Sequence, residues 1–258
     1  MSDFISMLHA NPWIIIASGA AIGYLVGSIS VARIVYSLAT GSHEYEPFAE
    51  PVPHTDKTFE SDLISATWVT KKLNRKYGCA TSILDMAKVA VPTLVFRLLF
   101  PTQPYFLLVA LCGIAGHNYP IYYRFNGGRG ESPILGALLV TNWFGLLVTN
   151  AAATIIGYVV GSVLVVRWGA YVLFILWFWL YFNDWWYVAF AVGANFLFWF
   201  SMRDDLKTFQ ELKNQGHEFS QEDVSEFIMM GKTLGRFLDK YGLFHVVGRL
   251  LKKWQQGN

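Results

Sequence analysis

The chain has 258 residues, of which 54% are hydrophobic and 15% charged, and its formal net charge is +2. Several apolar runs are too long for the core of a soluble domain, so the composition excludes a soluble globular protein and indicates an integral membrane protein. The near-neutral charge gives no sign of nucleic-acid binding. The two cysteines lie at or inside apolar runs, which excludes a disulfide framework and offers no metal-ligand spacing.

The apolar runs predict a polytopic all-α protein. Residues 1–12 are mildly polar without a basic leader, so we expect no cleavable signal peptide, and the first run acts as its own insertion signal. The last two runs each exceed a bilayer core of about 30 Å, so we expect them to fold back at Asn150 and at Asn183–Asp184. We therefore predict a transmembrane helical bundle of about seven spans. The runs cover residues 13–38, 79–100, 104–123, 133–166 and 168–200.

Lysine and arginine residues predict the orientation. They follow the first and third runs and are numerous between Arg203 and Lys253, whereas Arg97 is the only one that we place near the opposite surface. The positive-inside rule then puts the N-terminus outside the cell and these polar regions in the cytoplasm. We expect the membrane to be the plasma membrane.

Within the first run, Gly19, Gly23 and Gly27 recur every four residues, the small-residue pattern that lets membrane helices approach closely. Ser28 and Ser30 follow, and such serines commonly bond back to a helix carbonyl. We assign these serines no catalytic role. The segment 42–60 mixes acidic residues with three prolines, which predicts an extended, solvated surface insertion.

Asp85 and Lys88 lie three residues apart in the second run, so they share a helical face and can form an ion pair. Ionisable groups within a span favour a functional role, and a purely structural ion pair is the alternative. Lys88 is long enough to reach a phosphate group at the cytoplasmic mouth of the bundle.

The segment 116–130 places His117, two arginines and several glycines between two long apolar runs. Polar groups and flexible backbone at the end of a span usually line a polar cavity. In Gly127–Gly130, glycines allow close backbone approach, and Arg129 can grip phosphate oxygens. A tight turn with one interfacial arginine is the alternative.

The residues 208–258 predict an amphipathic helical tail after a transmembrane domain of residues 1–207. Ser220 to Asp223 resembles a capping box, and apolar residues follow at helical spacing. A second segment, around Leu250 and Lys253, is also basic and amphipathic. We expect it to lie on the inner membrane face, with a partner-binding surface as the alternative.

These motifs together resemble the acyl-phosphate glycerol-3-phosphate acyltransferases, the PlsY-type family. The resemblance implies a seven-helix enzyme that moves a fatty acyl group from acyl phosphate to the 1-hydroxyl of glycerol 3-phosphate. The products are lysophosphatidic acid and inorganic phosphate, and the pathway is phospholipid synthesis. It implies no metal and no cofactor, and membrane lipids as surroundings. The motifs that carry it are Ser61, Ala66-Thr67, Gly78, Asp85-x-x-Lys88, Gly116-His117-x-Tyr119-Pro120 and Gly127-Gly128-Arg129-Gly130.

The resemblance also implies site residues. His117 can act as a general base near neutral pH or as a hydrogen-bonding anchor that fixes the loop. We favour the anchor, because a phosphate-bearing substrate can serve as its own base. The catalytic candidates are His117, Lys88 and Ser61, and the substrate-binding candidates are Lys71, Gly127, Gly128, Arg129, Gly130, Arg203 and Asp205.

The chain also departs from the family pattern. Glu60 and Asp62 flank Ser61 where the family has glycines, and Asp205 stands where the family has an asparagine. The second hypothesis is therefore a non-catalytic relative that binds lipid or phosphate ligands. A transporter ranks third, because the chain shows no clear internal repeat.

Overall fold

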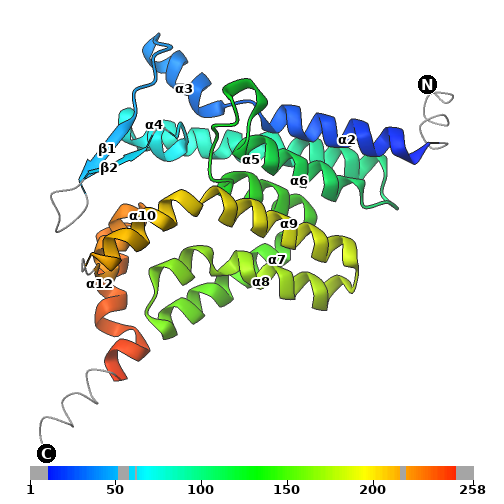
Figure 1. Cartoon of the computed structure of the whole chain (residues 1–258). Coiled ribbons are helices and arrows are strands. Elements are labelled where there is room, and N and C mark those ends of the chain that lie inside the picture. The colour runs from blue at the N-terminus through cyan, green and yellow to red at the C-terminus, as the bar shows by residue number, and fades with distance from the viewer. Residues whose placement is uncertain (1–10, 52–57, 62, 216–218, 248–258) are drawn as a thin grey trace, which may run out of the picture.

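The computed structural model describes residues 11–51, 58–61, 63–215 and 219–247. Over these residues the fold is a helical bundle with one small antiparallel hairpin (Figure 1). The all-α prediction is thus confirmed apart from this hairpin. The elements are α2 (Pro12–Gly27), α3 (Val31–Thr40), β1 (Phe48–Pro51), β2 (Thr58–Ser61), α4 (Ala66–Lys72), α5 (Arg75–Leu99), α6 (Tyr105–Asn118), the 3-10 turn η1 (Ile121–Tyr123), α7 (Glu131–Val160), α8 (Val163–Phe182), α9 (Trp185–Ser201), α10 (Arg203–Asn214), α11 (Gln221–Phe227) and α12 (Lys232–Tyr241).

Several helices are long and apolar enough to cross a membrane. Among the described residues there are four such helices, or five if the bent pair α9 and α10 forms one span. Helix α6, at 14 residues, is shorter than the roughly 20 residues of a typical span. The predicted count of seven spans is therefore not confirmed, whereas the membrane-protein class is.

The first apolar run is not one continuous helix. α2 ends at Gly27, and α3 begins at Val31 after a short non-helical break at Ser28–Ser30. The Ser28 hydroxyl donates to the Tyr24 carbonyl at 2.7 Å, the back-bond that the sequence predicted. This break opens backbone carbonyls toward the neighbouring helices.

The glycines of α2 form its contact with α6, as their spacing predicted. A Cβ atom at Gly23 would overlap the carbonyl of Val109, and one at Gly27 would overlap the carbonyl of Gly113. Packing between membrane helices relies on such close approach because lipid offers no hydrophobic driving force. α2 is thereby fixed along α6.

The fourth run reverses direction, but at Asn142 and not at Asn150. Asn142 has non-helical dihedral angles (φ −161°, ψ 84°), and its side chain accepts a hydrogen bond from the Gly145 amide. Asn150 stays helical, because three alanines, the best helix formers, come directly after it and its amide bonds back to the Leu146 carbonyl at 2.7 Å. The prediction of a turn at Asn150 was wrong.

Contacts along α8 show the reversal. Glu131 pairs with Arg167, and a Cβ atom at Gly145 would meet Trp177. At Gly157, near the end of α7, it would meet Val166. Along α7, the contacted residue on α8 therefore shifts from Arg167 toward the C-terminal end, to Trp177, and then back toward the N-terminal end, to Val166. The next turn does lie at Asn183–Asp184, as predicted: Asn183 adopts a left-handed conformation (φ 49°), and Asp184 caps α9.

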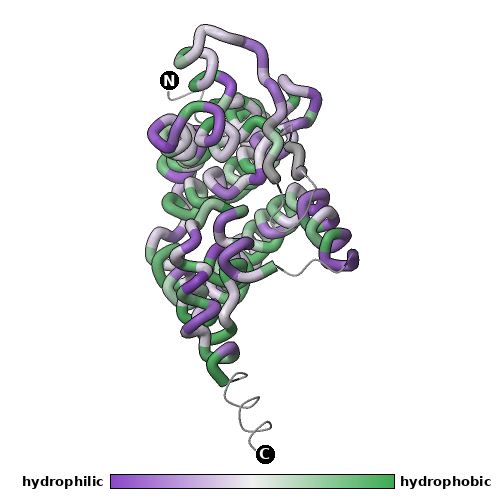
Figure 2. The backbone as a smooth tube through the Cα atoms, turned by 90° about the vertical axis from the view of Figure 1, so that its left-hand side faces the viewer, coloured by the Kyte–Doolittle hydropathy of each residue, from purple (hydrophilic) through white to green (hydrophobic). Residues whose placement is uncertain are grey.

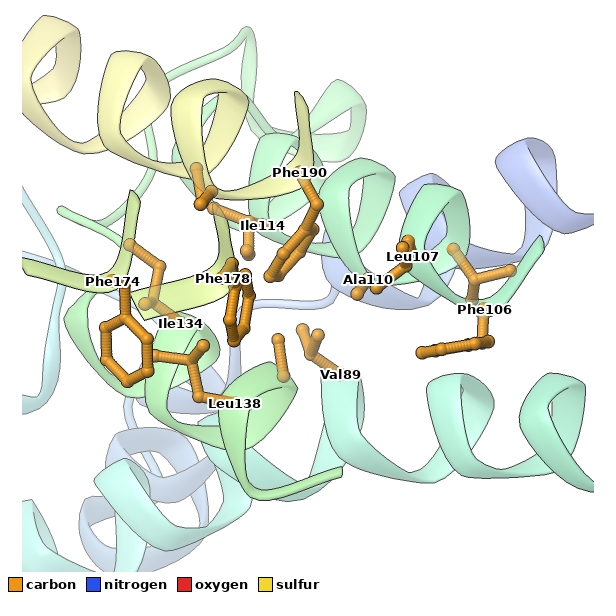
Figure 3. Packing of buried hydrophobic residues seen from close by; sticks show 14 of the residues in the cluster. Val89, Phe106, Leu107, Ala110, Ile114, Ile134, Leu138, Phe174, Phe178 and Phe190 are labelled. Atoms are coloured by element: carbon orange, nitrogen blue, oxygen red, sulfur yellow. The ribbon is translucent and has the colours of Figure 1, made fainter. Parts of the chain in front are cut away.

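The bundle core lies where α5 to α9 meet. Figure 3 shows Phe174, Phe178 and Phe190 of α8 and α9 facing Ile114 of α6 and Leu138 of α7. Phe178 and Ile114 are fully buried. This interdigitated packing holds α6 and the first half of α7 in place, and a polar pocket is built at their ends.

In the described parts of the acidic segment 42–60, residues 42–51 and 58–60, the chain is extended, as predicted, and β1 pairs with β2 as a hairpin, with Ala49 opposite Glu60. Next to it, the Trp68 side chain of α4 is fully buried, and its indole nitrogen donates to the Glu46 carbonyl at 3.0 Å. Residues 52–57 of this segment lie outside the described part of the chain.

The tail docks on the turn between α7 and α8. The Gln221 side chain accepts from the Val163 amide at 2.8 Å, and His245 Nε2 lies 3.1 Å from the Gly161 carbonyl oxygen. The predicted capping box at Ser220 and Asp223 is present. The second amphipathic segment, around Leu250 and Lys253, lies outside the described residues.

One arginine joins the tail to the bundle. Arg167 of α8 forms a two-pronged ion pair with Glu131, with nitrogen–oxygen distances of 2.9 and 2.6 Å. Its remaining terminal nitrogen donates to the Ile228 carbonyl in the tail. Glu131 is the first residue of α7 and comes directly after the segment Gly127–Gly130, which we call the glycine loop. This contact therefore links the tail to the glycine loop.

The polar elements gather at one end of the bundle. Figure 1 shows the hairpin, α4, α10 and α12 at the end opposite Asn183–Asp184 and the start of α2. Figure 2 looks at this end, where several hydrophilic stretches face the viewer.

We predict that Arg167→Gln loosens the tail. The substitution leaves the Glu131 carboxylate, whose side chain is 26% exposed, without its two-pronged partner. We expect a loss of about 1–3 kcal/mol, seen as a lower melting temperature in lipid nanodiscs and as faster chymotrypsin cleavage after Phe237 and Tyr241. The control is Arg236→Gln, which breaks the solvent-exposed pair with Glu222 and should change neither measurement. Equal effects of the two variants would contradict this assignment.

Candidate active site

A small pocket lies where the break between α2 and α3 faces α5 and the end of α6. Its wall is formed by the break itself, the first turn of α3, Ile64 before α4, polar side chains of α5 and α6, and the segment from Pro120 to Gly128. The lining residues are Gly27, Ser28, Ile29, Ser30, Val31, Ala32, Ile64, Asp85, Lys88, His117, Pro120, Gly127 and Gly128.

Lys88 is the centre of this pocket. Its ammonium nitrogen lies 2.7 Å from the Ile29 carbonyl oxygen, 2.8 Å from Asp85 Oδ1 and 3.0 Å from His117 Nδ1. The Ile29 carbonyl and His117 Nδ1 can each accept a hydrogen bond from this ammonium group, whereas Asp85 contacts it as an ion pair. Lys88 thereby joins α5 to the helix break and to α6.

Asp85 balances the charge of Lys88. Its side chain is 4% exposed, and its Oδ1 also lies 3.5 Å from His117 Nδ1. A buried ammonium without a counter-charge would be strongly destabilised, so Asp85 is what permits Lys88 to remain charged at this depth. The predicted pairing of Asp85 with Lys88 is therefore present in the structure.

His117 faces Lys88 with one ring nitrogen and the glycine loop with the other. Nδ1 can accept a hydrogen bond from the Lys88 ammonium, which leaves the imidazole proton on Nε2. The Nε2 edge lies against Gly128, where a Cβ atom would overlap it. The ring is thus held from both sides.

The glycines of the loop are needed for close packing. The Gly128 amide donates to the His117 carbonyl at 3.0 Å, so it is engaged within the protein. A Cβ at Gly127 would overlap the same carbonyl, and Gly130, at φ +86°, lies against the Asn118 side chain. Of the predicted loop residues, Gly127 and Gly128 line the pocket, whereas Gly130 packs against Asn118.

Arg129 points away from this pocket. Its guanidinium forms an ion pair with Asp205 of α10 and donates to the Ser201 carbonyl of α9 at 2.9 Å. The Ser201 hydroxyl in turn donates to the Arg129 carbonyl at 3.0 Å. The structure brings the predicted residues Arg129 and Asp205 together as a link between the loop and the last helices.

Two other predicted residues, Lys71 and Arg203, are not brought to Lys88. Lys71, in the last turn of α4, is not among the described residues that line the pocket. The Arg203 guanidinium lies 4.1 Å from the centre of the Phe200 ring, and its Nε is 3.6 Å from Asp204. Ser61 ends strand β2, but its side chain is outside the part that the structure describes.

The sequence interpretation missed two features of the pocket. Ile29 contributes a backbone carbonyl, which no side-chain pattern announces, although the run Gly27-Ser28-Ile29-Ser30 was a signal for a helix break. Arg33, on the first turn of α3, lies between the rings of Tyr45 and Tyr123. A single arginine near the end of an apolar run gave no further signal.

Fold and site together define an integral membrane protein with a buried Asp–Lys–His group at one end of its helical bundle. The family model for glycerol-3-phosphate acyltransferase matches residues 52–211, more than half of the chain. The chain therefore belongs to the glycerol-3-phosphate acyltransferase family, of the PlsY type.

Individual relatives agree with this assignment. A glycerol-3-phosphate acyltransferase of Mycoplasma mycoides is 29% identical over 215 residues, which cover 73% of this chain and 77% of the relative. Glycerol-3-phosphate acyltransferase 5 of Dehalococcoides mccartyi is 34% identical over 121 residues, 47% of each chain. This match, like that to an Anaeromyxobacter relative at 55%, spans about half of the relative's length.

A solved structure shares the fold. The glycerol 3-phosphate form of PlsY, an integral membrane glycerol 3-phosphate acyltransferase, superposes with a TM-score of 0.61 at 21% sequence identity. The superposition covers 81% of this chain and 98% of PlsY.

We predict that Gly128→Ala displaces the His117 ring. A methyl group there would overlap both carbon and nitrogen atoms of the imidazole, and overpacking of this kind costs about 1–3 kcal/mol. The melting temperature in nanodiscs should fall. The control is Gly169→Ala, where the nearest neighbours would be side-chain atoms at 3.2 and 3.3 Å and alanine favours the helix. A Gly128→Ala variant as stable as wild type would contradict this packing of the loop on His117.

Proposed function

We propose that this protein is a membrane acyltransferase that moves a fatty acyl group from acyl phosphate to the 1-hydroxyl of glycerol 3-phosphate. Lysophosphatidic acid and inorganic phosphate are the products, in phospholipid synthesis. The observation that carries the proposal is the buried Asp85–Lys88–His117 group beside a glycine loop, in a chain of this family.

The reaction asks little covalent chemistry of the protein. The acceptor hydroxyl attacks the acyl carbonyl, a carbon–oxygen ester bond forms, and the bond between the acyl carbon and the phosphate oxygen breaks. Phosphate leaves and takes up the hydroxyl proton. Positioning the two substrates and stabilising the developing charge supply most of the rate in such a reaction.

Lys88 and His117 form a rigid polar surface of the pocket in which this chemistry takes place. The Lys88 ammonium, held at 2.8 Å from Asp85, provides a permanent positive field toward the pocket while its N–H groups hold the helix break in place. Because Nδ1 of His117 faces the Lys88 ammonium and the Nε2 edge packs against Gly128, these contacts favour the anchor over the general base. Ser61, Lys71 and Arg203 remain candidate contacts to the phosphates, and Arg129 with Asp205 positions the loop.

We further propose that the pocket end of the bundle faces the cytoplasm and that the membrane is the plasma membrane. The lysines and arginines of α4, the start of α5 and α10 support this, since they lie with the glycine loop at one end. The N-terminus is then outside. The catalytic domain comprises residues 1–207, and the cytoplasmic tail comprises residues 208–258.

A second candidate function is a non-catalytic relative that binds lipid or phosphate ligands. The specific observation in its favour is that two cations predicted for substrate, Lys88 and Arg129, are already engaged by Asp85 and Asp205. Turnover of acyl phosphate separates the two candidates, because only the enzyme releases phosphate from it.

Purified protein in nanodiscs is given palmitoyl phosphate, and release of inorganic phosphate is measured with and without glycerol 3-phosphate. We expect release that depends on the acceptor and falls at least about 100-fold in Lys88→Met, because the fixed charge is lost. Lys76→Met, which removes an exposed lysine on the same helix, is the control and should be as active as wild type. No release from folded protein, beside an active relative, would favour the binding role.

A separate substitution tests the part played by His117. Asparagine can accept the Lys88 hydrogen bond but cannot act as a base near neutral pH. If His117 is an anchor, His117→Asn keeps more than about a tenth of the activity and leaves the pH profile unchanged; loss of a general base costs about 10²–10⁴-fold. A loss in that range, with a changed pH profile, would make His117 the base.

A further inference from the structure

Arg33 of α3 contacts two aromatic rings, and we call this arrangement the aromatic clamp. Its guanidinium carbon lies 4.8 Å from the centre of the Tyr45 ring and 4.5 Å from that of Tyr123. A guanidinium within about 6 Å of a ring face is attracted to it. Contact with two rings therefore restricts the rotation of a long side chain.

The clamp lies at the rim of the pocket. Val31 and Ala32, which immediately precede Arg33, line the pocket, and so does Pro120, which directly precedes the turn that carries Tyr123. The two segments that bound the pocket on this side thus meet at Arg33.

Arg33 is an uncommitted cation beside this pocket. Lys88 is engaged by the Ile29 carbonyl, Asp85 and His117, and Arg129 is paired with Asp205. For Arg33 the contacts within the described part of the chain are the two rings, with no carboxylate and no hydrogen-bond acceptor. Attraction to a ring face uses no hydrogen-bond acceptor, so the N–H groups of Arg33 can still donate to a ligand.

We propose that Arg33 binds the phosphate monoester of a ligand at the mouth of the pocket, through the N–H edge of its guanidinium. A planar fork of N–H donors matches two phosphate oxygens, and the clamp lowers the entropy lost when the fork is used. The identity of the ligand as glycerol 3-phosphate rests on the proposed function; the phosphate chemistry rests on Arg33 itself.

The test measures binding of inorganic phosphate and of glycerol 3-phosphate to the full chain in phosphatidylcholine nanodiscs, by calorimetry. Arg33→Gln should weaken both at least about tenfold, the loss typical of a charge-assisted hydrogen bond. Arg33→Lys should lie between, because lysine keeps the charge without the fork. Tyr123→Leu, which removes one ring and no charge, should weaken binding about two- to fivefold.

The matched control is Arg124→Gln. Arg124 lies next to Tyr123 and carries the same charge, but its side chain is exposed. Binding by this variant should stay within about twofold of wild type. Phosphate binding by Arg33→Gln that equals wild type, or an Arg124→Gln loss as large as that of Arg33→Gln, would overturn the proposal. Melting temperatures confirm that each variant is folded.

Phosphatidic acid added to the nanodiscs distinguishes the two sources of a phosphate monoester. Competition with soluble phosphate in wild type, lost in Arg33→Gln, would identify a lipid headgroup as the ligand. Absence of competition would identify the soluble ester, and either result supports Arg33 as the phosphate-binding residue. Arg33-dependent phosphate binding by a protein that transfers no acyl group would leave this inference standing while the acyltransferase proposal fails.

Discussion

The Lys88 ammonium is the group on which the rest of the site depends. Three groups from three segments surround it: a backbone carbonyl in the break of the first span, a carboxylate on its own helix and an imidazole at the end of α6. A charged group at this depth is tolerated only with such partners. The break, the ion pair and the histidine therefore belong to one arrangement, and the pocket exists because they converge.

Close backbone packing provides the precision that this arrangement needs. α2 can carry the Ile29 carbonyl to Lys88 because Gly23 and Gly27 let it lie directly on the carbonyls of α6. Gly127 and Gly128 bring the loop onto His117 in the same way. Beyond the loop, Glu131 and Arg167 extend the contact to the tail, so the loop is supported from the bundle and from the C-terminal segment.

Much of the fold could be predicted from the sequence, because local patterns carried it. The glycine spacing of α2, the turn at Asn183 and the capping box at Ser220 each depend on residue type and position. The pairing of Asp85 with Lys88 depends on helical spacing. The prediction of a turn at Asn150 was wrong because the same run contains two Thr-Asn pairs, Thr141-Asn142 and Thr149-Asn150. The residues that follow each pair decide which asparagine ends a helix.

The site was harder to predict where it depends on backbone atoms or on distant contacts. The Ile29 carbonyl carries no residue signature, and the aromatic clamp on Arg33 joins residues from three separate segments. Arg129 looked like a phosphate ligand by its place in the loop, yet its guanidinium pairs with Asp205, more than seventy residues away. Membership in the family supports the proposed chemistry, and these contacts are the form that the site takes in this chain.

A double-mutant cycle on Asp85 and Lys88 measures whether the two buried charges depend on each other. Thermal unfolding in nanodiscs would be measured for Asp85→Leu, Lys88→Met and the two combined. The account predicts that each single substitution is strongly destabilising, by about 3–5 kcal/mol, because it leaves an unpaired buried charge. The double variant should then lose clearly less than the sum of the two, by more than about 1 kcal/mol. Additive losses would show that the two groups do not depend on each other, and would contradict the account.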